Sequence, residues 1–192
     1  PRKPKPAPLS RDEDLAIRTI IGEAKGEGQK GWEGVADVIR TRAKQSGKPF
    51  ADVVLAQNQF EPWDSRRKEL EGYDPNSPIF QQVARATLPV LRGERKGPAG
   101  DATHFYSPGS QAALGRKPPS WDNGKGVDIG NHRFFNLGYS GKGVHGTEVP
   151  PAVDLFDDYT KAIGVIDAPE PTSDLFSDYQ SAIGITPSPT VS

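Results

Sequence analysis

Apolar residues recur at helical spacing in the first quarter of the chain. Ser10, Arg11, Asp12 and Glu13 have the sequence of a capping box, in which the serine and the glutamate each satisfy a free backbone N–H at the start of a helix. The apolar positions that follow are Leu15, Ile17, Ile20, Ile21 and Ala24. This spacing predicts a helix that begins at Ser10 and buries one face. Glu23 would lie near its C-terminal end.

Two further helices are predicted from the same kind of pattern. One follows the glycine-containing turn 26–31 and ends before Gly47 and Pro49, so that the first two helices form a hairpin. Its apolar positions are Trp32, Val35, Ala36, Val38, Ile39 and Ala43. Another begins at Ser77-Pro78, because proline is favoured in the first helical position, and is closed by Pro89 and Gly93. Its apolar positions are Ile79, Phe80, Val83, Ala84 and Leu88.

The segments between and after these helices have a different pattern of apolar and polar residues. Residues 50–55 form a short apolar element, and residues 57–63 form a loop too rich in amides to be core, of the kind that lines clefts. Residues 102–108 and 127–135 alternate in the manner of strands, with Trp121 in the Gly- and Pro-rich connection between them. The pattern predicts an α+β fold with a mainly helical lobe and a small β-lobe, over residues 10–140.

Both ends of the sequence differ from this domain. Residues 1–9 alternate Pro with Lys, Arg and Ala, which is typical of an extended linker, and residues 141–192 form a flexible tail. The tail holds a repeat, because residues 154–164 (DLFDDYTKAIG) recur as residues 174–184 (DLFSDYQSAIG). Each copy has the spacing of a short amphipathic helix. Two such helices cannot build a core alone, so they are either docking motifs for a partner protein or a duplicated spacer.

Composition excludes several classes of function. With 24 basic and 25 acidic residues the chain has no excess of positive charge for nucleic acid, and no run of about 20 apolar residues would insert into a membrane. Cysteine is absent and histidine occurs three times, without the spacing of a zinc site. We therefore expect no metal and no cofactor.

Glu23 is the candidate catalytic residue. It ends an apolar helical stripe, and Gly26 and Gly28 after it let the backbone turn and approach a ligand closely. A carboxyl group held half in a core and half in a cleft is partly desolvated, which raises its pKa. Such a group keeps its proton near neutral pH and can act as a general acid.

Four blocks of sequence resemble, in the same order, the SleB-type cell-wall hydrolases, a family of spore cortex-lytic enzymes and related bacterial and phage peptidoglycan lytic enzymes. The blocks lie at residues 20–42 (IIGEAKGEGQKGWEGVADVIRTR), 53–60, 102–108 (ATHFYSP) and 121–135. Carried over by position, Glu23 matches the family's catalytic glutamate and Glu27 its second acidic residue. The chain departs from the family at Thr41, where the family has Asn, and at His104, where it has an aromatic residue.

The resemblance implies a lysozyme-like domain that acts at the bacterial cell wall, in the periplasm or envelope, on peptidoglycan strands. It implies a lytic transglycosylase that cleaves the bond between N-acetylmuramic acid and N-acetylglucosamine with a single glutamate. The alternatives are a muramidase that uses water and a non-catalytic glycan-binding module of a larger virion or envelope protein. A phage protein that opens the wall during genome delivery, carried in the virion, would combine these roles.

Other residues are candidates for substrate binding. Glu27, one helical turn beyond Glu23, is a rival acid or a supporting residue. Tyr106, Trp121 and Phe60 could stack on sugars or line the cleft, since an aromatic ring has an apolar face, or could simply pack in the core. His132 could hydrogen-bond substrate or orient Glu23, and the amide of Gln59 suits an N-acetyl group.

Overall fold

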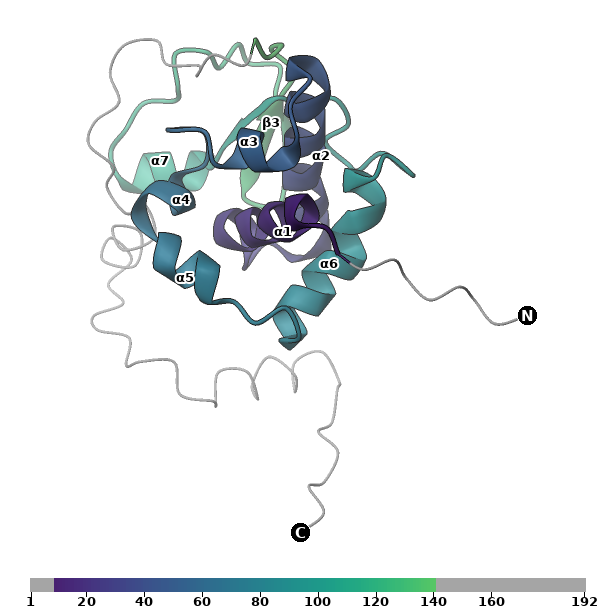
Figure 1. Cartoon of the computed structure of the whole chain (residues 1–192). Helices are drawn as coiled ribbons and strands as arrows, with labels where there is room; N and C mark the ends of the chain where they lie inside the picture. The colour runs from purple at the N-terminus through teal and green to yellow at the C-terminus, as the bar shows by residue number, and fades with distance from the viewer. Residues whose placement is uncertain (1–8, 141–192) are drawn as a thin grey trace, which may run out of the picture.

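The computed structural model describes residues 9–140, which contain seven helices and three strands (Figure 1). The helices are α1 (Arg11–Ala24), α2 (Gly28–Ser46), α3 (Phe50–Val54), α4 (Glu61–Ser65), α5 (Arg67–Gly72), α6 (Pro78–Leu91) and α7 (Pro108–Ala113). The strands are β1 (His104–Tyr106), β2 (Val127–Ile129) and β3 (His132–Phe135). The lead-in and both tail repeats lie outside the described residues.

The first helix is the centre of the helical lobe. It contacts α2, α3, α4, α5 and α6. In its predicted apolar stripe Ile17, Ile20, Ile21 and Ala24 are buried, and Leu15 is partly buried. The capping box is present: Ser10 Oγ accepts from the backbone N–H of Glu13, and the Glu13 carboxylate accepts from that of Ser10. At the other end, Trp32 Nε1 donates to the Ala24 carbonyl at 2.7 Å and so fixes the start of α2 against the end of α1.

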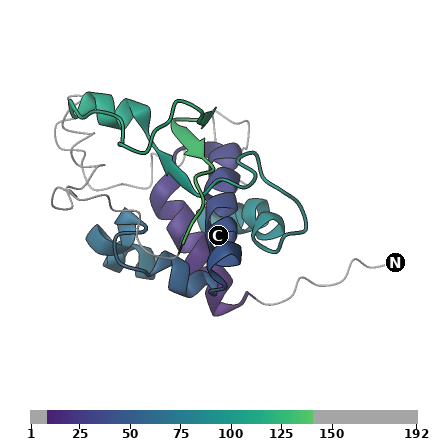
Figure 2. The same cartoon turned by 90° about the horizontal axis from the view of Figure 1, so that it is seen from above.

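The strands form one antiparallel sheet in the order β1-β3-β2, on one side of the helical bundle (Figure 2). His104 pairs with Phe135 and Ile129 with His132 in the register. The sheet meets α2 at Gly34, where a β-carbon would come within 2.8 Å of the Phe134 ring. A glycine there lets the ring lie directly on the helix backbone.

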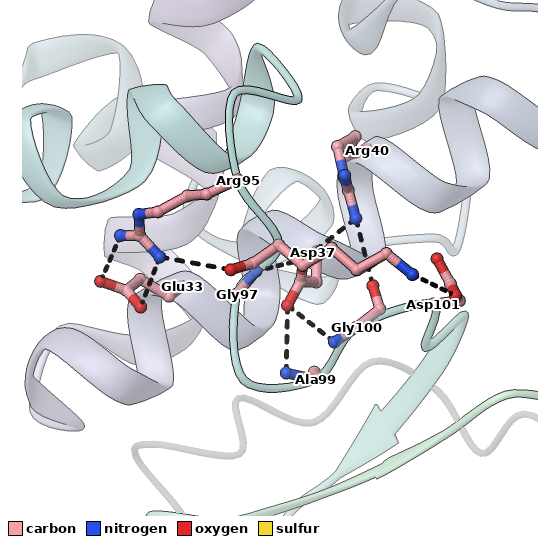
Figure 3. A network of polar contacts seen from close by, with 9 residues as sticks. Glu33, Asp37, Arg40, Arg95, Gly97, Ala99, Gly100 and Asp101 are labelled. Carbon is pink, nitrogen blue, oxygen red and sulfur yellow. Dashed lines mark hydrogen bonds and ion pairs between the residues drawn. The ribbon is translucent and has the colours of Figure 1, made fainter.

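A buried carboxylate fixes the connection between α6 and the sheet (Figure 3). Asp37 on α2 is fully buried and accepts hydrogen bonds from the backbone N–H groups of Gly97, Ala99 and Gly100 at 2.9 to 3.0 Å. Burial raises the pKa of Asp37, and these bonds partly oppose that rise. Arg40 adds a contact to the carboxylate at 3.3 Å. The loop that leads into β1 is therefore attached to α2 through its own backbone.

The predicted α+β architecture, with a mainly helical lobe and a small β-lobe, is confirmed, but some elements differ from expectation. Residues 57–63 are not a loop outside the core, because Phe60 and Trp63 are buried and α4 begins at Glu61. Residues 127–135 form two strands rather than one, since Gly130 turns the chain with a φ of 61°. The third predicted helix passes through Pro89 and ends at Leu91.

Candidate active site

Glu23 lies in the last turn of α1 with its side chain only partly exposed. None of the described residues forms a hydrogen bond to its carboxyl group. Burial raises the pKa of Glu23 to about 8, and the neighbouring Glu61 adds to this rise, while Arg66 and Arg42 partly oppose it. A carboxyl group in this environment is largely protonated at neutral pH, which is the form that a general acid requires.

Side chains of α4 and α5 pack against the backbone of α1 next to Glu23. A β-carbon at Gly22 would come within 2.8 Å of Pro62 Cβ and 2.9 Å of Leu70 Cδ2, so these side chains lie directly on the helix. Arg66 Nη2 donates to the Gly22 carbonyl at 3.0 Å. Glycine at position 22 thus allows α4 to approach the turn that carries the candidate acid.

Arg42 is a buried cation on the α2 side of Glu23. Its Nε donates to the Thr103 carbonyl at 2.7 Å, and its Nη1 lies 3.3 Å from Gln59 Oε1. The guanidinium lies over the rings of Phe60 and Tyr139, at 5.1 and 5.2 Å from their centres. Burial lowers the pKa of Arg42 to about 10, which leaves it charged at neutral pH. Arg42 therefore joins α2, β1 and the segment before α4 next to Glu23.

His104 extends this cluster into the sheet. Thr103 Oγ1 accepts from the Leu137 backbone N–H at 3.0 Å and lies 2.8 Å from His104 Nδ1 and 3.5 Å from the Phe135 carbonyl. Burial and Arg42 lower the pKa of His104 to about 4, so the ring is neutral. Its buried Nε2 has no hydrogen-bond partner among the described residues.

Glu27 is held by the β2–β3 hairpin. Its carboxylate accepts from the Asn131 backbone N–H at 2.7 Å and from Asn131 Nδ2 at 3.0 Å. His132 Nδ1 lies 3.8 Å from the same carboxylate, and burial lowers the pKa of His132 although Glu27 opposes the shift. These contacts connect the α1–α2 turn to the sheet.

Tyr106 on β1 and Trp121, from the connection between α7 and β2, belong to one aromatic cluster with His104 and Phe135. The Trp121 ring centre lies 5.3 Å from His104, 5.6 Å from Tyr106 and 5.3 Å from Phe135. Tyr106 is buried, and its hydroxyl donates to Asp122 at 2.6 Å. Trp121 is half-buried and keeps part of its ring accessible.

The predicted site residues thus fall into separate groups. Gln59 and Phe60 meet at Arg42 beside Glu23, whereas Glu27 and His132 form their own cluster at the hairpin. Phe60 is buried in the core, and the Gln59 Oε1 atom is also within 3.2 Å of the Tyr139 hydroxyl. A cavity of about 290 Å³ lies elsewhere, lined by Gly28, Gln29, Trp32, Gln82, Arg85 and Ala86. The assignments of these residues to substrate binding remain predictions.

Two charged residues beside Glu23, Arg42 and Glu61, are not among the site residues predicted from the sequence. Arg42 had a signal, because it continues the apolar stripe of Val35, Val38 and Ile39 on α2, where a charged residue is unexpected. No feature of the sequence pointed to Glu61, since a glutamate in a polar segment is common. Only the packing of α4 on Gly22 brings it to the site.

Because the pKa of Glu23 is raised by folding, Glu23→Gln should stabilise the protein at alkaline pH. Between the ordinary value near 4.5 and about 8, the folded chain binds the proton that the unfolded chain releases, so wild-type stability falls as pH rises. The variant lacks this loss, and we expect it to be more stable than wild type by roughly 2 to 4 kcal/mol at pH 8 and equally stable at pH 4. Urea denaturation at the two pH values measures the difference. Equal stabilities at pH 8 would contradict the raised pKa.

Within residues 9–140, no helix combines the length and the apolar character needed to cross a bilayer, and no group of three or more histidine, aspartate or glutamate side chains could hold a metal ion.

Comparison with known proteins supports the resemblance seen in the sequence. A solved structure, the catalytic domain of the Bacillus cereus SleB protein, aligns over 67% of this chain and 93% of its own, with 23% identity and a TM-score of 0.49. No curated protein matches the chain. The model of the cell wall hydrolase family matches residues 26–135, more than half of the chain, and begins just after Glu23. The chain belongs to the cell wall hydrolase family.

Proposed function

We propose that this protein is an endo-acting peptidoglycan lytic transglycosylase in which Glu23 acts first as acid and then as base. Membership of the cell wall hydrolase family supports peptidoglycan as the substrate. The observation that carries the choice of residue is the environment of Glu23: a partly buried carboxyl group without a hydrogen bond from the described residues and with a pKa raised to about 8.

The reaction follows from the state of this carboxyl group. Protonated Glu23 donates its proton to the glycosidic oxygen, and the bond to the muramic acid carbon breaks as positive charge develops on that sugar. The 6-hydroxyl of the same sugar then attacks the carbon, and the Glu23 carboxylate takes the hydroxyl proton. The products are a 1,6-anhydro end and a free 4-hydroxyl, and Glu23 is again protonated.

The remaining charges have supporting positions in this scheme. Arg42 stays positive and its charge opposes the rise in the pKa of Glu23, so it would stabilise the carboxylate that forms after the first proton transfer. The Glu27 carboxylate is engaged by Asn131, which fits a structural part in the turn after Glu23 better than a second acid.

The test is the mass of the products that the wild-type protein releases from purified sacculi in water labelled with heavy oxygen. A transglycosylase gives ends one water lighter than reducing ends, resistant to borohydride and free of label. Labelled reducing ends would replace the proposal with a hydrolysing muramidase. Binding to sacculi without any soluble product would favour a glycan-binding module.

A further inference from the structure

We propose that Glu61 is a positioning residue of the active site: it precedes Pro62, which packs on the last turn of α1, and its carboxylate supplies the negative charge that keeps the proton on Glu23. This inference rests on the proposed function, because it concerns the group that donates the proton.

The packing of α4 on α1 brings the two glutamates together. Glu61 is the first residue of α4, and Pro62 after it lies on Gly22, the residue before Glu23. The contact is fixed on both sides, by Arg66 on the Gly22 carbonyl and by Trp63 Nε1, which donates to Thr19 Oγ1 at 2.8 Å. The position of Glu61 next to the candidate acid is therefore set by the fold and not by a mobile loop.

No described residue forms a hydrogen bond or an ion pair with the Glu61 carboxylate in this position. Its Oε1 atom is buried and has no hydrogen-bond partner among the described residues. Arg66, the nearest cation in the sequence, directs Nη2 to the Gly22 carbonyl and Nη1 to Glu69 at 3.6 Å. A buried carboxylate oxygen without a partner costs free energy, so glutamine or an apolar residue would serve the fold better here.

The unfavourable burial of the Glu61 carboxylate can be explained by its effect on the ionisation of the neighbouring Glu23 carboxyl group. Like charges close together disfavour ionisation, so a negative charge at position 61 favours the protonated form of Glu23. The charged groups that act on Glu23 from the described part of the chain are Glu61 and Arg66 on the α4–α5 side and Arg42 from α2. Glu61 is the one of these whose charge favours the protonated form, and it acts in the same direction as burial.

The inference is tested by the pH dependence of initial muropeptide release at low sacculus concentration, between pH 4.5 and 9.5. In Glu61→Gln the midpoint of the alkaline limb should fall by about 0.5 to 1 pH unit, which lowers the rate at high pH by about 3- to 10-fold. The rate at pH 5, where Glu23 is protonated in either protein, should stay within about 3-fold of wild type. Glu61→Asp, which keeps the charge, should restore the midpoint.

The matched control is Glu71→Gln. Glu71 is an exposed glutamate on α5 that pairs with Arg67 at 3.6 Å and is not among the groups that shift the pKa of Glu23, so its removal should leave the profile unchanged. A midpoint that does not move in Glu61→Gln, or a rate that falls equally at every pH, would overturn the inference. If Glu61→Gln does not fold by circular dichroism, Glu61→Ala carries the same test.

A titration that does not depend on turnover separates this inference from the proposed function. Carbon-13 NMR of the side-chain carboxyl groups in the full chain, with the Glu23 signal assigned by its loss in Glu23→Gln, gives the pKa of Glu23 directly. A lower pKa of Glu23 in Glu61→Gln supports the inference even if wild type cleaves nothing, and an unchanged pKa overturns it even if wild type is a transglycosylase.

Discussion

Glu23→Gln is expected to release muropeptides from purified sacculi about 10³-fold more slowly than wild type. Glutamine has nearly the same shape but cannot donate a carboxyl proton to the leaving oxygen. The raised pKa of Glu23 and the absence of hydrogen bonds to it from described residues make this proton available for transfer. The initial rate of soluble muropeptide release at pH 6, where the wild-type carboxyl group is protonated, is the appropriate measurement.

The matched control for this experiment is Glu27→Gln, because Glu27 is the other glutamate of the same segment. Its carboxylate already accepts two hydrogen bonds from Asn131, and a glutamine oxygen can keep one of them. We expect this variant to retain at least about a tenth of the wild-type rate, since a residue outside the chemistry loses little when its shape is kept. A Glu23→Gln protein that works at the wild-type rate would exclude Glu23 as the acid.

The second large effect is expected on stability, from Asp37→Ala. The substitution removes the acceptor of three backbone N–H groups in the loop of residues 97–100 (Figure 3). The N–H groups of Gly97 and Ala99 then have no acceptor among the described residues, and that of Gly100 keeps a bond to the Gly97 carbonyl at 3.3 Å. Breaking a buried charged network of this kind costs about 3 to 5 kcal/mol. Urea denaturation at pH 7, followed by circular dichroism, should show a loss of this size in the free energy of unfolding.

Asp101→Ala is the control for Asp37→Ala, because it removes a carboxylate from the same loop at an exposed position. Its ion pair with Lys96, at 2.9 Å, has both side chains more than half exposed, so water and salt screen it. We expect a far smaller change in stability. If the two variants lose equal amounts, the buried carboxylate is not what secures the loop.

The sequence predicted the helical part of the fold well where local signals and burial agree. The capping box at Ser10 and the apolar stripe from Leu15 to Ala24 specify α1 and the place of Glu23 at its end. These features depend on residues within a few turns of one another, so spacing alone reveals them.

What could not be predicted depends on contacts between distant segments. Trp63 and Phe60 are buried because α4 packs against α1, and nothing in the local pattern of residues 57–63 indicates a neighbour about 40 residues earlier. The same packing places Glu61 beside Glu23. The position of Arg42, unlike that of Glu61, could have been inferred from the sequence, because the helical spacing places it on the buried face of α2.

The bond between Glu27 and Asn131 spans 104 residues of the chain and ends four residues from Glu23. Any change that loosens the hairpin near Asn131 also frees the backbone just after the proton donor. Loss of activity in variants of β2 or β3 therefore does not by itself show that these strands contact the glycan. The same loss results if the Glu23 carboxyl group is no longer held in the orientation that proton transfer requires.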